Sequence, residues 1–139
     1  MLAYITQYAN TILDRYRDPY HGTPLFFDGM NTVTGEPVKW RNMDGKDWEP
    51  SNIASQQNLF RTLVSLSALT GEPKYKQAAM NAIQWHFDHA DESGLLIWGG
   101  HCFLDLKTLD TVGPEGKNKV HEIKHHYPFY ELMFETDAG

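Results

Sequence analysis

The sequence has little cysteine and no long hydrophobic run. Its single cysteine, Cys102, cannot form a disulfide within the chain, which argues against a small secreted domain held by disulfides. No stretch approaches the roughly 18 apolar residues of a membrane span, and the first ten residues lack the basic and apolar regions of a signal peptide. We therefore expect no membrane partner and a location in the cytoplasm or the periplasm.

Positive charge is also scarce. Twelve Lys and Arg stand against eighteen Asp and Glu, which gives a formal net charge of −6 and argues against nucleic-acid binding. The length of 139 residues and the 41% hydrophobic content suffice for one core, so we expect a single domain or part of a larger one.

Most of the chain has the periodicity of amphipathic helices. Apolar residues recur at helical spacing in three segments, and Gly71 and Pro73 link two of them in a helical hairpin. Helical hairpins in series favour a toroid or solenoid. The expected helices span residues 2–17, 51 or 52 to 70, and 73 toward Gly94, with a further helix over 120–133 that begins no later than Tyr127.

Short extended pieces interrupt the helices. Residues 24–27 and 37–40 could pair around a turn at 31–35. Residues 95–98 are apolar. After Gly99 and Gly100, polar and apolar residues alternate over residues 101–106, and this pattern predicts a short β-like excursion. Residues 109–119 are expected to form a loop.

Histidines are concentrated near the C-terminal end. His101, His121, His125 and His126 lie within 26 residues of one another, together with Glu122 and Glu131. Imidazole and carboxylate ligands suit Zn, Mn, Co or Ni better than metals that prefer thiolates. His121 and Glu122 are adjacent and point in different directions, so at most one of them joins His101. His121 and His125 could instead share a helical face and form a competing site.

Four stretches of the chain resemble the pectate lyases of polysaccharide lyase family 2. The more specific ones are Trp-Gly-Gly-His, which ends at His101, and Val-His-Glu, which ends at Glu122. The similarity extends over most of the chain. The similar stretches are residues 51–58, 94–101, 103–109 and 120–124, the last followed by 127–130.

The resemblance implies a fold, a reaction and a metal. Such enzymes are all-helical (α/α) barrels, so residues 1–139 would be the N-terminal portion of one barrel domain with short β-like excursions. They cleave polygalacturonate or oligogalacturonates by β-elimination with the aid of Mn, Co or Ni. His101 and Glu122 match two of the three metal ligands.

The resemblance also leaves positions of the family's site unmatched. The third metal ligand and the catalytic arginine correspond to a part of the family sequence beyond Gly139, so we expect this chain alone to be deficient in catalysis. Trp98 and Lys124 are candidate substrate-binding residues. Lys124, His125 and His126 would be the substitutes for the base if the chain alone proved active.

Several residues have simpler structural explanations. Trp40, Trp48 and Trp98 could stack on a sugar, but each is expected to be a packing residue. Gln56, Gln57 and Asn58 are expected to meet water at a helix start. His21, His86 and His89 have no partner that the sequence identifies.

The sequence leaves two other functions open. A glycoside hydrolase on a related helical toroid would need two carboxylates across a cleft and no metal. A non-catalytic helical-repeat binding module is supported only by the hairpin link between Gly71 and Pro73.

Overall fold

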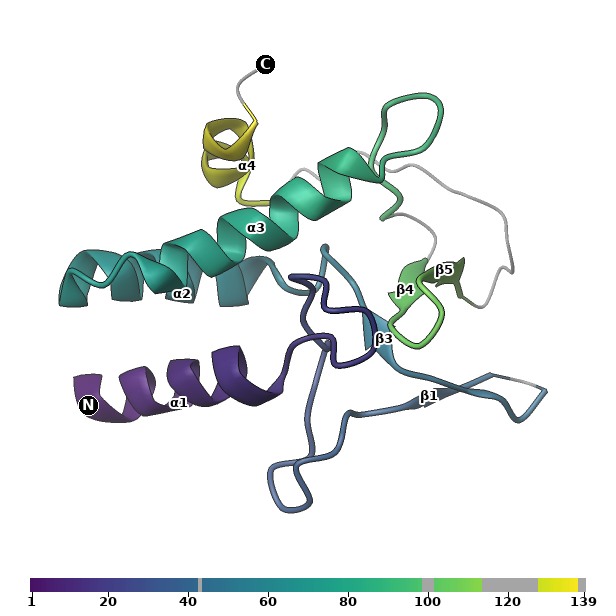
Figure 1. Cartoon of the computed structure of the whole chain (residues 1–139), viewed down its shortest axis with the longest axis horizontal. Helices are drawn as coiled ribbons and strands as arrows, with labels where there is room; N and C mark the ends of the chain where they lie inside the picture. The colour runs from purple at the N-terminus through teal and green to yellow at the C-terminus, as the bar shows by residue number, and fades with distance from the viewer. Residues whose placement is uncertain (43, 99–101, 114–127, 138–139) are drawn as a thin grey trace.

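A computed structural model describes residues 1–42, 44–98, 102–113 and 128–137, and Figure 1 shows its helices and strands. The elements are α1 (Leu2–Arg15), β1 (Trp40–Arg41), β2 (Asp47–Trp48), β3 (Pro50–Ser51), α2 (Gln57–Thr70), α3 (Lys74–Asp88), β4 (Phe103–Asp105), β5 (Asp110–Val112) and α4 (Tyr130–Thr136).

The prediction of an all-helical barrel is wrong, because the described residues form a mixed α/β fold of four helices and two antiparallel sheets. One sheet is β1–β2 and the other has the order β3-β4-β5. The helices and the sheets occupy opposite sides of the molecule in Figure 1. The periodicity of a short segment could not reveal these sheets, because Ser51 pairs with Leu104, more than fifty residues away.

The helix α1 agrees closely with its prediction. Its apolar stripe buries Ala9 and Ile12 in the main core, which also contains residues of α2 and α3, and the helix ends at Arg15, ahead of Pro19. The main core contains these two residues together with Phe26, Ile53, Phe60, Leu63, Leu66, Tyr75, Ala78, Ala79, Ala82, Ile83, Trp98, Leu132 and Met133.

The predicted hairpin of α2 and α3 is confirmed, and Figure 1 shows the two helices packed side by side. Gly71 ends α2 in the left-handed conformation, with φ of 76°, and its N–H donates to the Ser67 carbonyl over 2.9 Å. Pro73 caps the start of α3, which ends at Asp88 rather than near Gly94.

The predicted start of α2 is wrong by about five residues. Ser51 belongs to β3, and the Asn52 side-chain oxygen accepts a hydrogen bond from the Ala54 N–H over 3.0 Å. Side-chain bonds of this kind compete with helix formation. Turns therefore occupy the residues before Gln57, where the helix begins.

The predicted pairing of residues 24–27 with 37–40 is also wrong. Phe26 forms an isolated bridge with Arg17, and Trp40 pairs with Trp48 in the β1–β2 ribbon. The turn itself is confirmed, since the Gly35 N–H donates to the Asn31 carbonyl over 2.8 Å.

The β-like excursion is confirmed only in part. Residues 95–98 form no strand, whereas β4 lies within the predicted 101–106 segment. Residues 110–112, predicted to be loop, form β5 after a turn in which Leu109 has a positive φ of 59°. The last helix begins at Tyr130, three residues later than Tyr127, and Phe129 caps it.

Within the described ranges, every helix is too short or too polar to cross a bilayer.

Candidate functional site

The residues predicted to bind metal lie outside the described residues. His101, Glu122 and Lys124 fall in the ranges 99–101 and 114–127, as do His121, His125 and His126 of the alternative sites. The structure therefore tests neither the metal ligands nor the substrate role of Lys124.

The chain is anchored on both sides of His101. Trp98 belongs to the main core with 9% of its surface exposed, and Cys102 is fully buried. Such burial is typical of a packing residue, and the substrate role of Trp98 stays a prediction.

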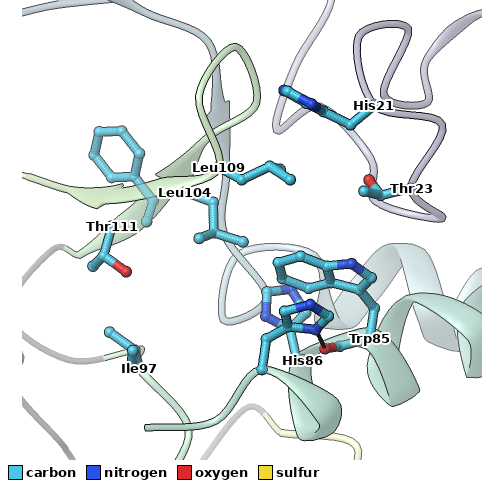
Figure 2. Close-up of a pocket in the computed structure, with 10 residues that line it drawn as sticks. His21, Thr23, Trp85, His86, Ile97, Leu104, Leu109 and Thr111 are labelled. Atoms are coloured by element: carbon cyan, nitrogen blue, oxygen red, sulfur yellow. Dashed lines mark hydrogen bonds between the residues drawn. The ribbon is translucent and has the colours of Figure 1, made fainter.

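A well-formed pocket lies between α3, the β4–β5 hairpin and the loop that follows α1. Its volume is about 470 Å³, within the size range of small-molecule sites. In Figure 2, Trp85 and His86 lie on one side of it, and Ile97, Leu104 and Thr111 on the opposite side. The complete lining is His21, Thr23, Trp85, His86, His89, Ile97, Phe103, Leu104, Leu109 and Thr111.

His86 is the buried polar residue of this pocket. Its Nε2 atom has no hydrogen-bond partner among the described residues, and its ring contacts Trp85 edge-on at 5.4 Å between centroids. Burial and, secondarily, the nearby His89 lower the pKa of His86 to about 4. The imidazole is therefore neutral at pH 7.

The other two pocket histidines are fixed by backbone carbonyls. The His89 ring stacks on Trp85 at 3.8 Å, and its Nδ1 lies 2.7 Å from the Trp85 carbonyl oxygen. The Nε2 atom of His21 lies 3.1 Å from the Lys107 carbonyl oxygen. Because a carbonyl only accepts, both nitrogens carry the proton in these contacts.

A buried acidic network holds the loop that carries His21. The Tyr20 hydroxyl donates to Glu49 Oε2 over 2.6 Å, and Lys107 Nζ lies 3.0 Å from Glu49 Oε1. The bond to Glu49 raises the pKa of Tyr20 to about 12. The Glu49 N–H in turn donates to Asp105 Oδ1 over 3.0 Å.

Asp18 organises the same loop from its other end. Its carboxylate accepts the N–H groups of Tyr20, His21 and Thr23 and the Thr23 hydroxyl. Burial alone would raise the pKa of Asp18, but these hydrogen bonds together bring it below its ordinary value. The loop is therefore built around an ionised carboxylate.

The pocket lining suits polar, largely uncharged contacts. Its members include three imidazoles and two hydroxyls but no Asp, Glu, Lys or Arg side chain. The described part of the chain also contains no group of three or more His, Cys, Asp and Glu residues placed to hold a metal ion.

Sequence reasoning missed both the pocket and the buried glutamines. Gln56 and Gln57, expected to meet water, are 4% and 2% exposed. Trp85 and His89 stand four residues apart on a helix, and this spacing alone could have suggested their stacking. His21 reaches the pocket only when segments more than sixty residues apart in sequence come together, so no local sequence pattern indicated its place there.

Comparison with known proteins identifies the family. Residues 23–139 match the model of the family described as periplasmic pectate lyase, and the chain therefore belongs to this family. Over 135 residues it is 42% identical to a pectate disaccharide-lyase of Dickeya dadantii (strain 3937). That alignment covers 96% of this chain and 24% of the relative, so the chain spans about a quarter of the relative's length. The resemblance predicted from the sequence is thereby confirmed.

Proposed function

We propose that the protein cleaves polygalacturonate or oligogalacturonates by metal-assisted β-elimination. The observation that carries this proposal is the 42% identity, over nearly the whole chain, to a pectate disaccharide-lyase. The family's description also supports a periplasmic location.

The reaction removes the proton at C5 of a uronate, which is α to the carboxylate, and expels the substituent at C4. Negative charge develops on the carboxylate as the proton leaves, so cationic groups beside it lower the barrier. A divalent ion bound to the carboxylate would act there as a Lewis acid. We assign the proton-abstracting base to no residue of this chain.

His101 and Glu122 would hold the ion. One imidazole nitrogen and one carboxylate oxygen fit the preferences of Mn, Co and Ni, and the described residues offer no competing cluster of three ligands. Buried Trp98 and Cys102 support the proposal, because they restrict the chain on both sides of His101. Lys124 would supply a positive charge to the uronate.

The test is the product formed by the full-length protein from polygalacturonate. A lyase produces an unsaturated uronate that absorbs in the ultraviolet, and chelation should abolish its formation until Mn, Co or Ni is added. His101→Ala should lower the rate by at least about 100-fold, on the scale of losing a catalytic metal's ligand or its supporting contacts.

The matched control is His125→Ala, which removes a histidine of the competing pair. It should stay within about twofold of the wild-type rate. Loss of activity in His125→Ala but not in His101→Ala would move the metal to the His121–His125 pair. Release of reducing ends without ultraviolet absorbance would indicate a hydrolase.

A further inference from the structure

Trp40 is the exposed one of the four tryptophans. Its side chain is 44% exposed, whereas Trp48 and Trp98 are each 9% exposed and Trp85 is half-buried. The sequence predicted a packing role for Trp40. Exposure on this scale means that packing uses only part of the ring, and the remainder is open to another partner.

One face of the Trp40 ring is covered. Phe103 of β4 stacks on it with 5.1 Å between the ring centroids and 17° between the ring planes. Trp40 lies on the β1–β2 ribbon, which extends away from the helices in Figure 1. Phe103 therefore fixes the plane of the indole, and the exposed part of the side chain includes the opposite face.

The β1–β2 ribbon is basic within an acidic protein. Residues 37–48 contain three basic side chains against two acidic ones, whereas the whole chain has a net charge of −6. Arg41 and Asp47 neutralise each other through hydrogen bonds of 2.7 and 3.1 Å. The bonds from Arg41 lower the pKa of Asp47, and the nearby charge of Lys39 contributes to the same shift. Lys39 is thus an exposed cation next to Trp40 in sequence.

We propose that Trp40 is a platform on which a galacturonate ring of the polymer stacks, with Lys39 attracting the uronate carboxylates. This inference rests on the function proposed above, from which it takes its ligand. A pyranose ring has C–H groups on its face and hydroxyls at its edge, so it suits an aromatic face bordered by polar groups. The carboxylates of a polyuronate favour this ribbon over the acidic remainder of the surface.

Stacking on a rigid indole should affect binding rather than chemistry. The platform contacts the sugar equally in the ground state and in the transition state, so its loss should raise KM and leave kcat unchanged. On the scale of other aromatic contacts, the loss corresponds to a rise of about threefold to tenfold in KM.

The experiment uses the full-length protein and polygalacturonate. Initial rates of ultraviolet absorbance give kcat and KM, and retardation in native gels that contain polygalacturonate and a chelator measures binding without turnover. Trp40→Ala should weaken retardation and raise KM by about threefold to tenfold, with kcat within about twofold of the wild type. Trp40→Phe keeps an aromatic face and should stay within about twofold of the wild type in both measurements.

The matched control is Trp48→Phe. It alters the other tryptophan that contacts Phe103, but that ring is 9% exposed and presents no open face to a sugar. It should lower the melting temperature, as Trp40→Ala does, and leave KM and retardation within about 1.5-fold of the wild type.

Lys39→Gln tests the contribution of charge, and Lys74→Gln, at an exposed lysine on α3, is its control. Lys39→Gln should weaken retardation by about twofold at low salt, on the scale of exposed charge pairs. It should also make retardation less dependent on salt, because salt screens such charges in the wild type. Lys74→Gln should change neither quantity.

Three outcomes would overturn the inference. The platform is wrong if Trp40→Ala leaves KM and retardation within about 1.5-fold of the wild type. It is also wrong if Trp48→Phe raises KM equally, because the stability of the ribbon would then be the cause. The preference for a uronate is wrong if Lys39→Gln and Lys74→Gln behave alike. A wild-type protein that forms no unsaturated product would instead refute the proposed function, and retardation that still depends on Trp40 would then support the platform on its own.

Discussion

Acidic residues that the fold buries determine how the loops around the pocket are placed. Glu49 and Asp105 are almost completely buried, and both are hydrogen-bonded to backbone or side-chain donors. Each links chain segments that are far apart in sequence: Glu49 binds Tyr20, and Asp105 binds Glu49. An unpaired carboxylate at such a position would be costly, so the partners of these residues should matter more than surface charges do.

Lys107→Met should lower the free energy of unfolding by about 1–3 kcal/mol, because it leaves the buried Glu49 carboxylate with the Tyr20 hydroxyl but without its cation. Lys76→Met is the matched control, since Lys76 pairs with Glu135 at a more exposed position. The control should cost less than about 1 kcal/mol. Urea unfolding at pH 7 measures the free energy of unfolding of both variants. Equal losses in the two variants would contradict a special role for the Lys107–Glu49 pair.

His86 should make stability depend on pH in a defined direction. Its pKa falls from an ordinary 6.5 to about 4 on folding, so the unfolded chain binds the proton first as the pH is lowered. The contribution of the neutral imidazole is complete above about pH 7 and is lost as the pH falls from 6.5 to 4. Its loss at pH 4 amounts to about 3 kcal/mol.

The comparison that isolates this effect is His86→Phe, which keeps a ring beside Trp85 and cannot bind a proton. Between pH 7 and pH 4 this variant should lose about 3 kcal/mol less stability than the wild type does. His21→Phe replaces an exposed imidazole of the same pocket and should keep the wild-type dependence. Parallel stability curves for the wild type and His86→Phe would show that His86 is not buried as described.

The β1–β2 ribbon depends on an aromatic contact rather than on its own hydrogen bonds. Each strand has two residues, and a two-stranded ribbon of that size is marginal in water. Trp40 stacks on Phe103 at 5.1 Å, and Trp48 meets the same ring edge-on at 5.7 Å. Phe103 of β4 therefore connects the ribbon to the three-stranded sheet.

Phe103→Leu should cost about 1–3 kcal/mol in unfolding free energy, since it removes two aromatic contacts and part of a buried side chain. Hydrogen exchange should rise in the ribbon more than in α2 or α3. Phe134→Leu, at a ring that is 72% exposed, is the control and should change stability by less than about 0.5 kcal/mol. A uniform rise in exchange would mean that the ring stabilises the whole core rather than the ribbon.

Helices were more predictable than strands because their information is local. The apolar stripe of α1 and the Gly71–Pro73 link appear within a few residues of sequence, and both predictions are confirmed. The start of α2 was predicted wrongly because Ser51 is taken into a sheet by a partner beyond residue 100. Periodicity describes which face of a segment is apolar, but it does not say which distant segment will pair with it.

At the scale of the whole molecule, resemblance identified the family whereas the pattern of residues did not give the architecture. Residues 23–139 match the family, yet the expected barrel is replaced by four helices and two sheets in the described part of the chain. The predicted metal ligands, His101 and Glu122, remain predictions. The shared pocket of His21 and His86 could not be predicted, because it forms only when the loop after α1, β4 and α3 come together.

Metal binding should stabilise the full-length protein as a whole. A ligand that binds only the folded state adds about 2.7 kcal/mol when its concentration is 100 times its Kd. Thermal unfolding with Mn should therefore occur at a higher temperature than unfolding with a chelator, and the difference should disappear in His101→Ala and Glu122→Gln. An equal shift in the wild type and His101→Ala would place the ion elsewhere.

The pairing of Pro50 with Asp105 has a consequence for the order in which the protein forms during synthesis. The α2–α3 hairpin needs only residues up to Asp88 and brings together neighbours in sequence, so it can form while the rest is still being made. Strand β3 is synthesised before that hairpin, but its partner strand β4 is synthesised after the hairpin. The nascent chain must therefore carry an unpaired strand on the ribosome for some fifty codons, and the helical hairpin assembled in the meantime brings the two halves of the sheet within reach of each other.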